Sequence, residues 1–476
     1  MKTNASFDCE RSIAHATAQF KQIKNYIGGE AQTQDAYTVE GRLFRESMKL
    51  ALCMMGAYFE QKQGGDRGQL LSLPDGSTLP RERLQTKQLV TVFGELELKR
   101  WYYHEDGSSG VYPLDEEVNL PQRSFSYYVQ ETLGRATTGA TYDEVMADMQ
   151  RLYGFAPYKH SVEAIVEQAA CDVGSFYESR PLVAPETEAG ILVAAIDGKG
   201  VPMVKDSPAE HKRRLGRGEK LSRKKEATVS AVYTIAPYER TVEEIISEVR
   251  DKEYQASRPR PHNKHVQATL DGKQAMMQWV AREVQRRDPD GTKARVCIMD
   301  GSKGLWTQAR KELRGFTFVL DLFHVLEYLW KVAYVFYPEN SPEAEGFVRH
   351  RLRMLLEGKV GYVIGGLRQM LSKHHKLRRA ERGVILKTIA YYESNRKAMR
   401  YDEYIAAGYP IGSGAVEAAC RHLVKDRMEG SGMRWKINGA EAVLQLRAMY
   451  LNGDWDDYWQ HHMQCEYARR FGTAAA

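Results

Sequence analysis

Gly190-Ile191-Leu192-Val193-Ala194-Ala195-Ile196-Asp197-Gly198 is the stretch of sequence that decides the fold class of this chain. Its run of apolar residues at 191–196 is typical of a strand that is buried on both faces of a sheet. An aspartate directly after such a strand must find a partner or emerge into water. The glycine after it lets the backbone turn sharply and lets a ligand approach. The stretch therefore predicts a buried strand that ends in a functional carboxylate.

Two further apolar strands are predicted to end in an aspartate. Residues 294–299 precede Asp300-Gly301, and residues 316–320 precede Asp321. In α/β sheets, active groups collect beyond the carboxyl ends of the strands, because a rigid strand holds them while the following loop opens space. A plain turn is the alternative interpretation of any single Asp-Gly pair. Two such pairs after buried strands favour a shared site instead.

Strands alternate with helical patterns around these aspartates, which indicates a mixed α/β domain. Another strand is predicted at residues 227–235 and a helix at residues 274–286. Helical periodicity then continues from residue 325 to about 404, and residues 409–411 lead into a last long helix. We expect an α/β core at residues 186–324 and 406–460, an all-helical insertion at 325–405, and a C-terminal tail at 461–476.

The region before the core is expected to form two parts, a helical region at residues 1–87 and a DNA-binding region at 88–185. An amphipathic helix is predicted at residues 37–63, and alternating apolar residues at 88–103 predict a β-hairpin. Three short helices should follow; the second opens with a capping box, Thr141 with Glu144. The turn at residues 154–157 gives the pair around it the pattern of a helix-turn-helix, which also occurs in proteins that never touch DNA.

Composition places the chain among globular proteins with two or three domains. It has 476 residues, of which 43% are hydrophobic and 27% are charged. No apolar run approaches the ~20 residues that a membrane span needs, and residues 1–9 lack the apolar segment of a signal peptide. The six cysteines form no Cys-x-x-Cys pair, which argues against a structural zinc site and against a disulfide framework. The expected compartment is the cytoplasm.

Basic residues are concentrated near the predicted site, although the net charge is only +6. One run contains Lys212, Arg213, Arg214, Arg217, Lys220, Arg223, Lys224 and Lys225. A second basic region extends over residues 349–400. A lone run of this kind is most often a solvated loop. Two such regions around a set of carboxylates favour a polyanionic partner.

Carboxylates with few neighbouring His or Cys residues indicate a hard cation, Mg²⁺ or Mn²⁺, rather than zinc. Two such ions can activate an attacking hydroxyl and stabilise the leaving oxygen in phosphodiester displacement. Holding the second ion requires a third carboxylate.

The motifs around these acids carry a family resemblance. The chain resembles a DDE transposase of a bacterial insertion sequence, in the Mutator-like superfamily and its ISKra-type family. Residues 195–198 resemble the first catalytic motif of that family, residues 297–306 the second, residues 321–324 an accessory motif, and residues 411–417 the segment that supplies a catalytic glutamate. Many relatives carry a cysteine-rich zinc ribbon near residues 102–115, and this chain has no cysteine there.

The resemblance implies a fold and a set of site residues. It implies an RNase H-like (retroviral integrase-like) core split by a helical insertion, with Asp197, Asp300 and Glu417 as catalytic ligands of two Mg²⁺ or Mn²⁺ ions. Asp321 competes with Asp300 for the second position, and Glu327 and Glu429 compete with Glu417 for the third. The resemblance implies an accessory role for Asp321 and His324, and their three-residue spacing lets the two face the same side of a helical turn.

The resemblance also implies a function, namely metal-dependent cleavage and joining of DNA. Its partners would be the terminal inverted repeats of the element and the target DNA, bound by a homodimer or higher oligomer that associates with the nucleoid. The last helix should present a basic face for DNA, formed by Arg421, Lys425, Arg427 and Arg434. A catalytically inactive DNA-binding protein and a metal-dependent nuclease of the same fold are the alternatives.

Overall fold

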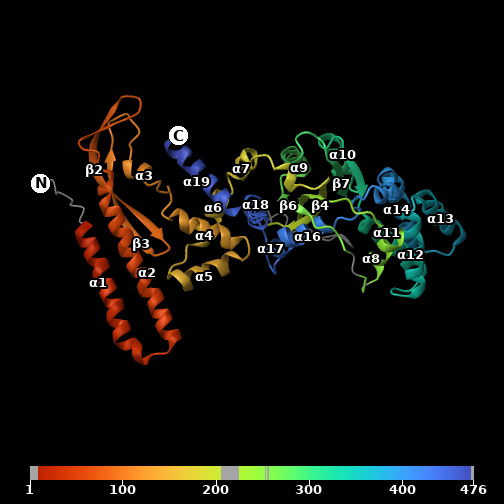
Figure 1. Cartoon of the computed structure of the whole chain (residues 1–476), viewed down its shortest axis with the longest axis horizontal. Coiled ribbons are helices and arrows are strands. Elements are labelled where there is room, and N and C mark those ends of the chain that lie inside the picture. Colours follow the sequence, from red (N-terminus) through yellow and green to blue (C-terminus); the bar gives the residue numbers. More distant parts are fainter. Residues whose placement is uncertain (1–8, 205–223, 252, 255–256, 473–476) are drawn as a thin grey trace, which may run out of the picture. The chain divides into compact units, whose positions relative to one another are not determined.

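The computed structural model describes residues 9–204, 224–251, 253–254 and 257–472 (Figure 1). The chain divides into two compact units, Met1–Asp172 with Asp456–Ala476, and Val173–Trp455. The expected C-terminal tail is largely helical, since helix α19 (Trp455–Phe471) includes most of it. Among the described residues, no helix is both long and apolar enough to cross a membrane.

The first unit begins with two long helices and a small antiparallel sheet. Helix α1 (Cys9–Gly28) packs against α2 (Ala36–Gln61). The sheet has the order β1-β2-β3, formed by β1 (Leu70–Ser72), β2 (Thr78–Thr91) and β3 (Gly94–Tyr103). Side chains from α2, the hairpin and the segment after it share a core of Phe59, Leu89, Leu98, Leu114 and Leu120. The predicted helix and hairpin are confirmed, and the short strand β1 is an addition to the prediction.

Three short helices form the rest of this unit together with α3 (Pro113–Glu117) and most of α19. They are α4 (Tyr127–Thr137), α5 (Tyr142–Tyr153) and α6 (Lys159–Ala169). The capping box is present: Thr141 Oγ1 accepts from the Glu144 amide at 3.2 Å, and the Thr141 amide donates to the Glu144 carboxylate at 2.8 Å. Gly154 ends α5 with a φ of 79°, a conformation that favours glycine. The helical pair with its turn is therefore confirmed as a structure.

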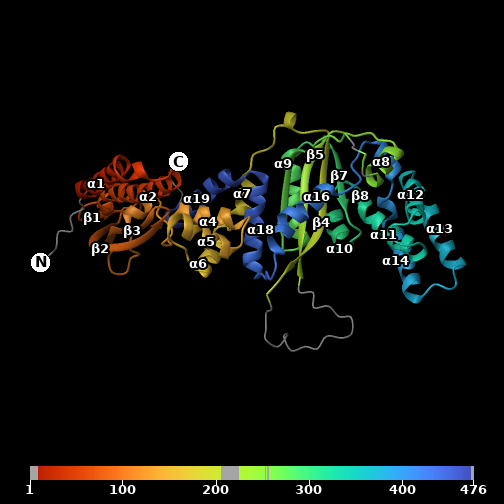
Figure 2. The same cartoon turned by 90° about the horizontal axis from the view of Figure 1, so that it is seen from below.

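The second unit contains a mixed five-stranded sheet of order β6-β5-β4-β7-β8 (Figure 2). Its strands are β4 (Ile191–Pro202), β5 (Lys224–Ile235), β6 (His262–Thr269), β7 (Ala294–Met299) and β8 (Thr317–Leu320). Strands β6, β5 and β4 pair antiparallel, and β4, β7 and β8 pair parallel. The mixed α/β class is confirmed.

The register of the parallel strands aligns the three aspartates. The β4–β7 ladder ends at Ile196 opposite Met299, and the β7–β8 ladder ends at Met299 opposite Leu320. Each aspartate is therefore the first residue beyond the parallel pairing. The prediction that β4 ends at Ile196 is wrong, because antiparallel pairing with β5 carries that strand on to Pro202. Asp197 projects from a continuous strand rather than from a loop.

Helices α9 (Lys273–Arg287), α10 (Lys303–Glu312) and α18 (Ile437–Asn452) belong to the same unit as the sheet, where α18 packs against β6. The helical periodicity predicted for residues 325–404 is matched by a series of helices. They are α11 (Leu322–Phe336), α12 (Pro342–Leu356), α13 (Val360–Lys373), α14 (Arg379–Asn395) and α15 (Tyr401–Ala406). Figure 2 shows α11–α14 grouped beyond β8. Tyr401 donates to the Leu320 carbonyl at 2.8 Å, so a buried hydrogen bond fastens the insertion to β8.

The prediction of one long, continuous last helix is wrong. Helix α16 (Gly414–Ala419) passes through a π-helical turn (Cys420–Lys425) into α17 (Asp426–Met428) and then stops. Gly432 follows with a φ of 76°, which a helix cannot accommodate. A separate helix, α18, begins at Ile437.

A buried charged cluster lies between α9, β6 and the end of α18. Arg180 contacts His265 Nδ1 at 2.8 Å and Asp454 at 3.2 Å. Glu283 lies nearby and pairs with Arg286 at 2.9 Å and with Arg287 at 3.3 Å. Burial and the positive charge of Arg180 lower the pKa of His265 to about 3, despite the opposing charge of Glu283. His265 is thus neutral in the folded protein at neutral pH.

This depressed pKa predicts a pH dependence of stability. Below pH 6.5 the unfolded chain protonates His265 while the folded chain does not, so stability falls as the pH drops from about 6.5 toward 3. In His265→Asn the slope of unfolding free energy between pH 6.5 and 5 should decrease by up to ~1.4 kcal/mol per pH unit. Urea unfolding of the unit that contains β6 measures it. The exposed His375→Asn should keep the wild-type slope, and an unchanged slope in His265→Asn would contradict the assignment.

Candidate metal centre

Asp197 lies on the central strand β4, directly beyond its pairing with β7, and contacts the π-helical turn that follows α16. Its Oδ1 accepts from the Gly198 amide at 2.7 Å, and its Oδ2 accepts from Cys420 Sγ at 3.7 Å. Gly198 lies against Glu226 of β5, where an added Cβ would stand 3.0 Å from the Glu226 carboxyl carbon. A side chain at this position would push Glu226 away, so the glycine keeps the backbone beside Asp197 closely packed.

Asp300 is the counterpart of Asp197 on the neighbouring strand. Its Oδ1 accepts from the Ser302 amide at 2.9 Å, and its carbonyl accepts from Trp306 Nε1 at 2.7 Å. An added Cβ at Gly301 would lie 2.1 Å from Tyr391 of α14, so no side chain fits there. Burial and the negative charge of Asp197 raise the pKa of Asp300. The two carboxylates repel each other, which a cation between them would relieve.

His324 completes the group. Asp197, Asp300 and His324 each offer one ligand atom, and these three atoms all lie within 4.8 Å of one another. His324 Nδ1 lies 2.7 Å from Asp321 Oδ2. That hydrogen bond raises the pKa of His324 to about 9, burial opposes the rise, and the charges of Asp321, Asp197 and Asp300 add to it. Without a metal ion, His324 is therefore a cation that faces two carboxylates at neutral pH.

Asp321 is hydrogen-bonded to His324 and holds its ring in place. Its side chain is fully buried, and its Oδ1 accepts from the Ser413 amide at 3.0 Å and from the Phe323 amide at 3.3 Å. With Oδ2 on His324, both of its oxygens are engaged. Asp321 thus orients His324 and fastens the segment before α16. This supports the choice of Asp300 over Asp321 as a ligand.

Replacing Asp321 tests this coupling. Asp321→Asn keeps an acceptor for the Ser413 amide but removes the negative charge beside His324. We expect the pKa of His324 to fall from about 9 toward its ordinary value of 6.5. An NMR titration of the His324 ring protons measures this, with the exposed Asp290→Asn as the matched control. An unchanged midpoint would show that Asp321 does not hold the proton on His324.

Glu417 lies beside the group on α16 but outside the set whose ligand atoms are all within 4.8 Å. Ser413 Oγ donates to its Oε1 at 3.4 Å. Burial and the charge of Asp321 raise its pKa, His324 lowers it, and Asp197 raises it. Its carboxylate thus interacts electrostatically with Asp321, His324 and Asp197.

The two rival glutamates point to other partners. Glu327 has a side chain that is 62% exposed and pairs with Lys331 at 3.5 Å. Glu429 pairs with Lys224. Neither belongs to the group of Asp197, Asp300 and His324.

The site includes residues that the sequence interpretation missed. Cys420 is buried, and its thiol donates a hydrogen bond to Asp197. Burial and the charge of that carboxylate raise the pKa of the thiol. The charge of Lys273 lowers the pKa of Asp300, while its ammonium lies 3.1 Å from Glu226. Lys199 stands two residues after Asp197 on β4, and its charge acts on Cys420. Period-2 alternation along β4 is the one local signal that could have indicated Lys199.

The structure describes only some of the predicted DNA-binding residues. Lys212, Arg213, Arg214, Arg217, Lys220 and Arg223 lie outside the described residues. Arg421, Lys425 and Arg434 are exposed. Arg427 differs from the expectation: it is 2% exposed and lies over the Trp435 ring at 4.8 Å, so its guanidinium packs inside the unit.

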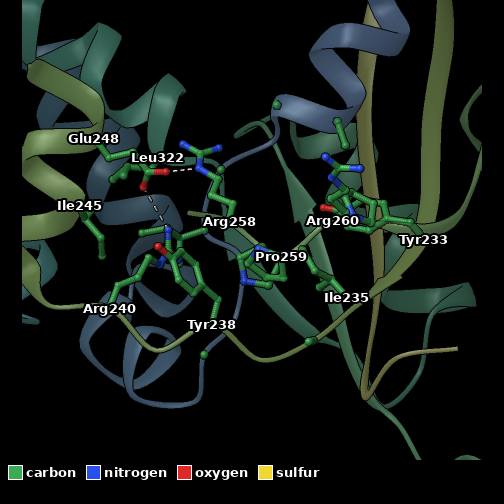
Figure 3. Close-up of a pocket in the computed structure, with 18 of the residues that line it drawn as sticks. Tyr233, Ile235, Tyr238, Arg240, Ile245, Glu248, Arg258, Pro259, Arg260 and Leu322 are labelled. Carbon is green, nitrogen blue, oxygen red and sulfur yellow. Dashed lines mark hydrogen bonds and ion pairs between the residues drawn. The ribbon is translucent and has the colours of Figure 1, made fainter. Parts of the chain in front are cut away.

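A cavity of about 440 Å³ adjoins the segments that carry Asp321 and Glu417 (Figure 3). Leu322, Phe323 and the small side chains of α16 line one side of it, and the end of β5 lines another. Figure 3 shows Arg240 and Arg258 paired with the same carboxylate, Glu248. The cavity is mainly apolar, and its charged side chains belong to other elements than the aspartates.

Comparisons with known proteins give a distant relative. No protein-family profile matches the chain. Over 392 residues it is 20% identical to the UPF0236 protein in vanSb 3'region of Streptococcus gallolyticus, which covers 80% of this chain and 76% of that protein. The name of that relative states no activity.

A solved structure, the Drosophila P element transposase strand transfer complex, is 10% identical and covers 74% of this chain and 83% of that chain, with a TM-score of 0.25. A TM-score this low gives the structural likeness no weight for fold or function.

Proposed function

We propose that this chain is a DDE-type transposase of a bacterial insertion sequence, of the Mutator-like, ISKra-type kind, which cuts and joins DNA. The observation that carries the proposal is the convergence of Asp197 and Asp300 from adjacent parallel strands, with a ligand atom of His324 within 4.8 Å and Glu417 nearby on α16. These acids stand in the motifs on which the family resemblance rests. Like-charged, half-buried carboxylates at one sheet edge are suited to a divalent cation.

The order of the strands supports an RNase H-like core. Three antiparallel strands followed by two parallel ones place the first aspartate in the central strand and the second in its parallel neighbour. The helical insertion enters after β8 and returns directly before the segment with Glu417. This is the arrangement that the resemblance implies for a core split by an insertion.

Asp197, Asp300 and Glu417 would hold Mg²⁺ or Mn²⁺, two ions in the full site. Bound metal supplies a Lewis acid and activates the attacking oxygen in phosphodiester displacement. The chain's own groups have separate tasks. Asp321 keeps His324 protonated and oriented, so that its free N–H can donate to a phosphate oxygen of the DNA. Lys199 and Lys273 add positive charge close to the carboxylates, where a phosphate would lie.

The DNA partners in this proposal are the terminal inverted repeats and the target. Helices α5 and α6 with their turn would bind the repeats, and the exposed Arg421, Lys425 and Arg434 would neutralise backbone phosphates. Because two ends must be paired, a homodimer or higher oligomer on DNA is part of the proposal. Association with the nucleoid would follow from DNA binding.

A strand-transfer assay with the element's own ends and Mg²⁺ tests the proposed function. Joined products support a transposase. Cut products without joining would point to a nuclease on the same fold. Repeat binding without any cutting would point to a DNA-binding protein that has lost catalysis.

A further inference from the structure

A second cluster of ligand-type side chains lies in the first unit, apart from the strand-end carboxylates. It comprises Cys171 and Asp172, just after α6, and His462 and Glu466, one turn apart on α19. One ligand atom from each of the four lies within 4.8 Å of the other three. Asp172, His462 and Glu466 are buried, at 7%, 1% and 4% exposure, while Cys171 is exposed. The cluster therefore combines three buried ligand-type side chains with one thiol that solvent can reach.

The contacts inside the cluster already direct these atoms toward one another. His462 Nδ1 lies 2.7 Å from Asp172 Oδ2, and Cys171 Sγ lies 3.4 Å from the same oxygen. Arg469 donates to Asp172 at 2.8 Å and to Glu466 at 2.9 Å. Its side chain is 45% exposed, so a cation that solvent can reach pairs with both buried acids.

We propose that Cys171, Asp172, His462 and Glu466 bind one Zn²⁺ ion. A thiolate, an imidazole nitrogen and two carboxylate oxygens are ligands that zinc accepts in four-coordinate protein sites. Ligand atoms of such a site lie roughly 3–4 Å apart, given metal–ligand distances of about 2.0–2.3 Å. The 3.4 Å separation already lies in this range, and the 2.7 Å contact between His462 and Asp172 has to lengthen by roughly half an ångström to accept the ion.

A second layer of groups orients the carboxylate of Glu466. Tyr127 Oη donates to its Oε2 at 3.4 Å, and Gln168 Nε2 donates to the same oxygen at 3.2 Å. Outer hydrogen bonds of this kind fix the orientation of metal ligands. Glu466 Oε1 makes neither of these bonds and accepts from Arg469 instead.

The charges balance with the ion bound. Zn²⁺ with one thiolate, two carboxylates and a neutral imidazole leaves a net charge of −1, and Arg469 supplies +1 beside it. Binding releases the proton of the Cys171 thiol to solvent, so no other reactant is needed. The site would join α19 to the end of α6, segments 290 residues apart in sequence. It would need no Cys-x-x-Cys motif, and it is independent of the proposed function.

Metal content of the full-length protein tests the proposal. All proteins should carry Asp300→Asn, so that metal at the strand-end carboxylates is not counted. We expect about one zinc ion per chain after dialysis against weak chelator, and a loss of most of it in Cys171→Ser. Cys171 is exposed, so this variant should fold, and its circular dichroism should match the parent. Cys53→Ser, in α2, is the matched control and should keep its zinc.

Cobalt substitution identifies the ligands directly. Co²⁺ added to the metal-free protein should give a thiolate-to-metal absorption band that is present in Cys53→Ser and lost in Cys171→Ser. Glu466→Gln should weaken binding of Co²⁺ at least tenfold, in line with loss of one ligand. A parent protein that holds no zinc and gives no thiolate band would overturn the proposal. Equal zinc content in Cys171→Ser and Cys53→Ser would do the same, and the cluster would then be an ion-pair network centred on Arg469.

Discussion

Asp197→Asn is expected to reduce DNA cleavage and strand transfer by roughly 10³-fold or more while repeat binding stays within twofold of the parent. The substitution keeps the shape of the side chain and its contact with the Gly198 amide but removes one of two charges that face a cation. Metal at such a site contributes several kcal/mol to stabilisation of the transition state, and each ~1.4 kcal/mol corresponds to a factor of ten in rate. DNA binding rests on other surfaces, so it should not change.

The measurement compares cleavage of a labelled repeat-end duplex with its binding by fluorescence anisotropy. Asp290→Asn, an exposed aspartate beyond α9, is the matched control and should retain full activity. Full strand transfer by Asp197→Asn would overturn the assignment of Asp197. Loss of binding and cleavage together would indicate misfolding, which circular dichroism would detect.

Glu417→Gln is the sharper test of the third ligand, because Glu417 lies outside the closest group. We expect the same pattern as for Asp197→Asn, with cleavage lost and binding kept. Glu429→Gln removes a rival carboxylate that pairs with Lys224, and it should leave cleavage unchanged. The reverse result, with Glu429 essential and Glu417 dispensable, would move the third position to Glu429.

Much of the core could be predicted because its strands are continuous apolar runs. Residues 191–196 and 294–299 have no polar interruption, so burial on both faces was readable without a partner in view. Strand β6 escaped prediction because only Val266 and Ala268 are apolar in it, while the polar residues His265, Gln267 and Thr269 are buried beside them. Their burial depends on partners such as Arg180 and Glu441, which come from distant segments.

The residues of the candidate site could likewise be predicted only in part. Asp197 and Asp300 follow recognisable strands, and the three-residue spacing of Asp321 and His324 correctly predicts that they meet. The position of Glu417 depended on family resemblance, since a glutamate in a helix has no local signature. Cys420 reaches Asp197 only because the chain passes from α16 into a π-helical turn. No spacing rule describes that contact.

Glu283→Gln is expected to be the most destabilising single change in the second unit, with a loss of ~3–5 kcal/mol of unfolding free energy. The Arg287 side chain is fully buried and has Glu283 at 3.3 Å and Glu188 at 3.5 Å as its acidic partners. Removing the charge of Glu283 leaves that guanidinium with Glu188 alone of these two acids, in a place that water does not reach. Urea unfolding at pH 7 measures the loss. Glu327→Gln breaks an exposed pair and should cost less than ~0.5 kcal/mol.

The pH dependence and a double variant separate the charge effect from simple packing. Burial opposes ionisation of Glu283, but Arg286 and Arg287 outweigh it and lower its pKa to about 2. The stabilisation is therefore complete above pH 4.5 and is lost as the pH falls toward 2, so Glu283→Gln should approach the parent's stability at acidic pH. Glu283→Met with Arg287→Met removes both charges and should recover much of the loss at pH 7, because an apolar pair needs no partner in the core. If the double variant is as unstable as Glu283→Gln alone, packing around α9 rather than the uncompensated charge of Arg287 determines the effect.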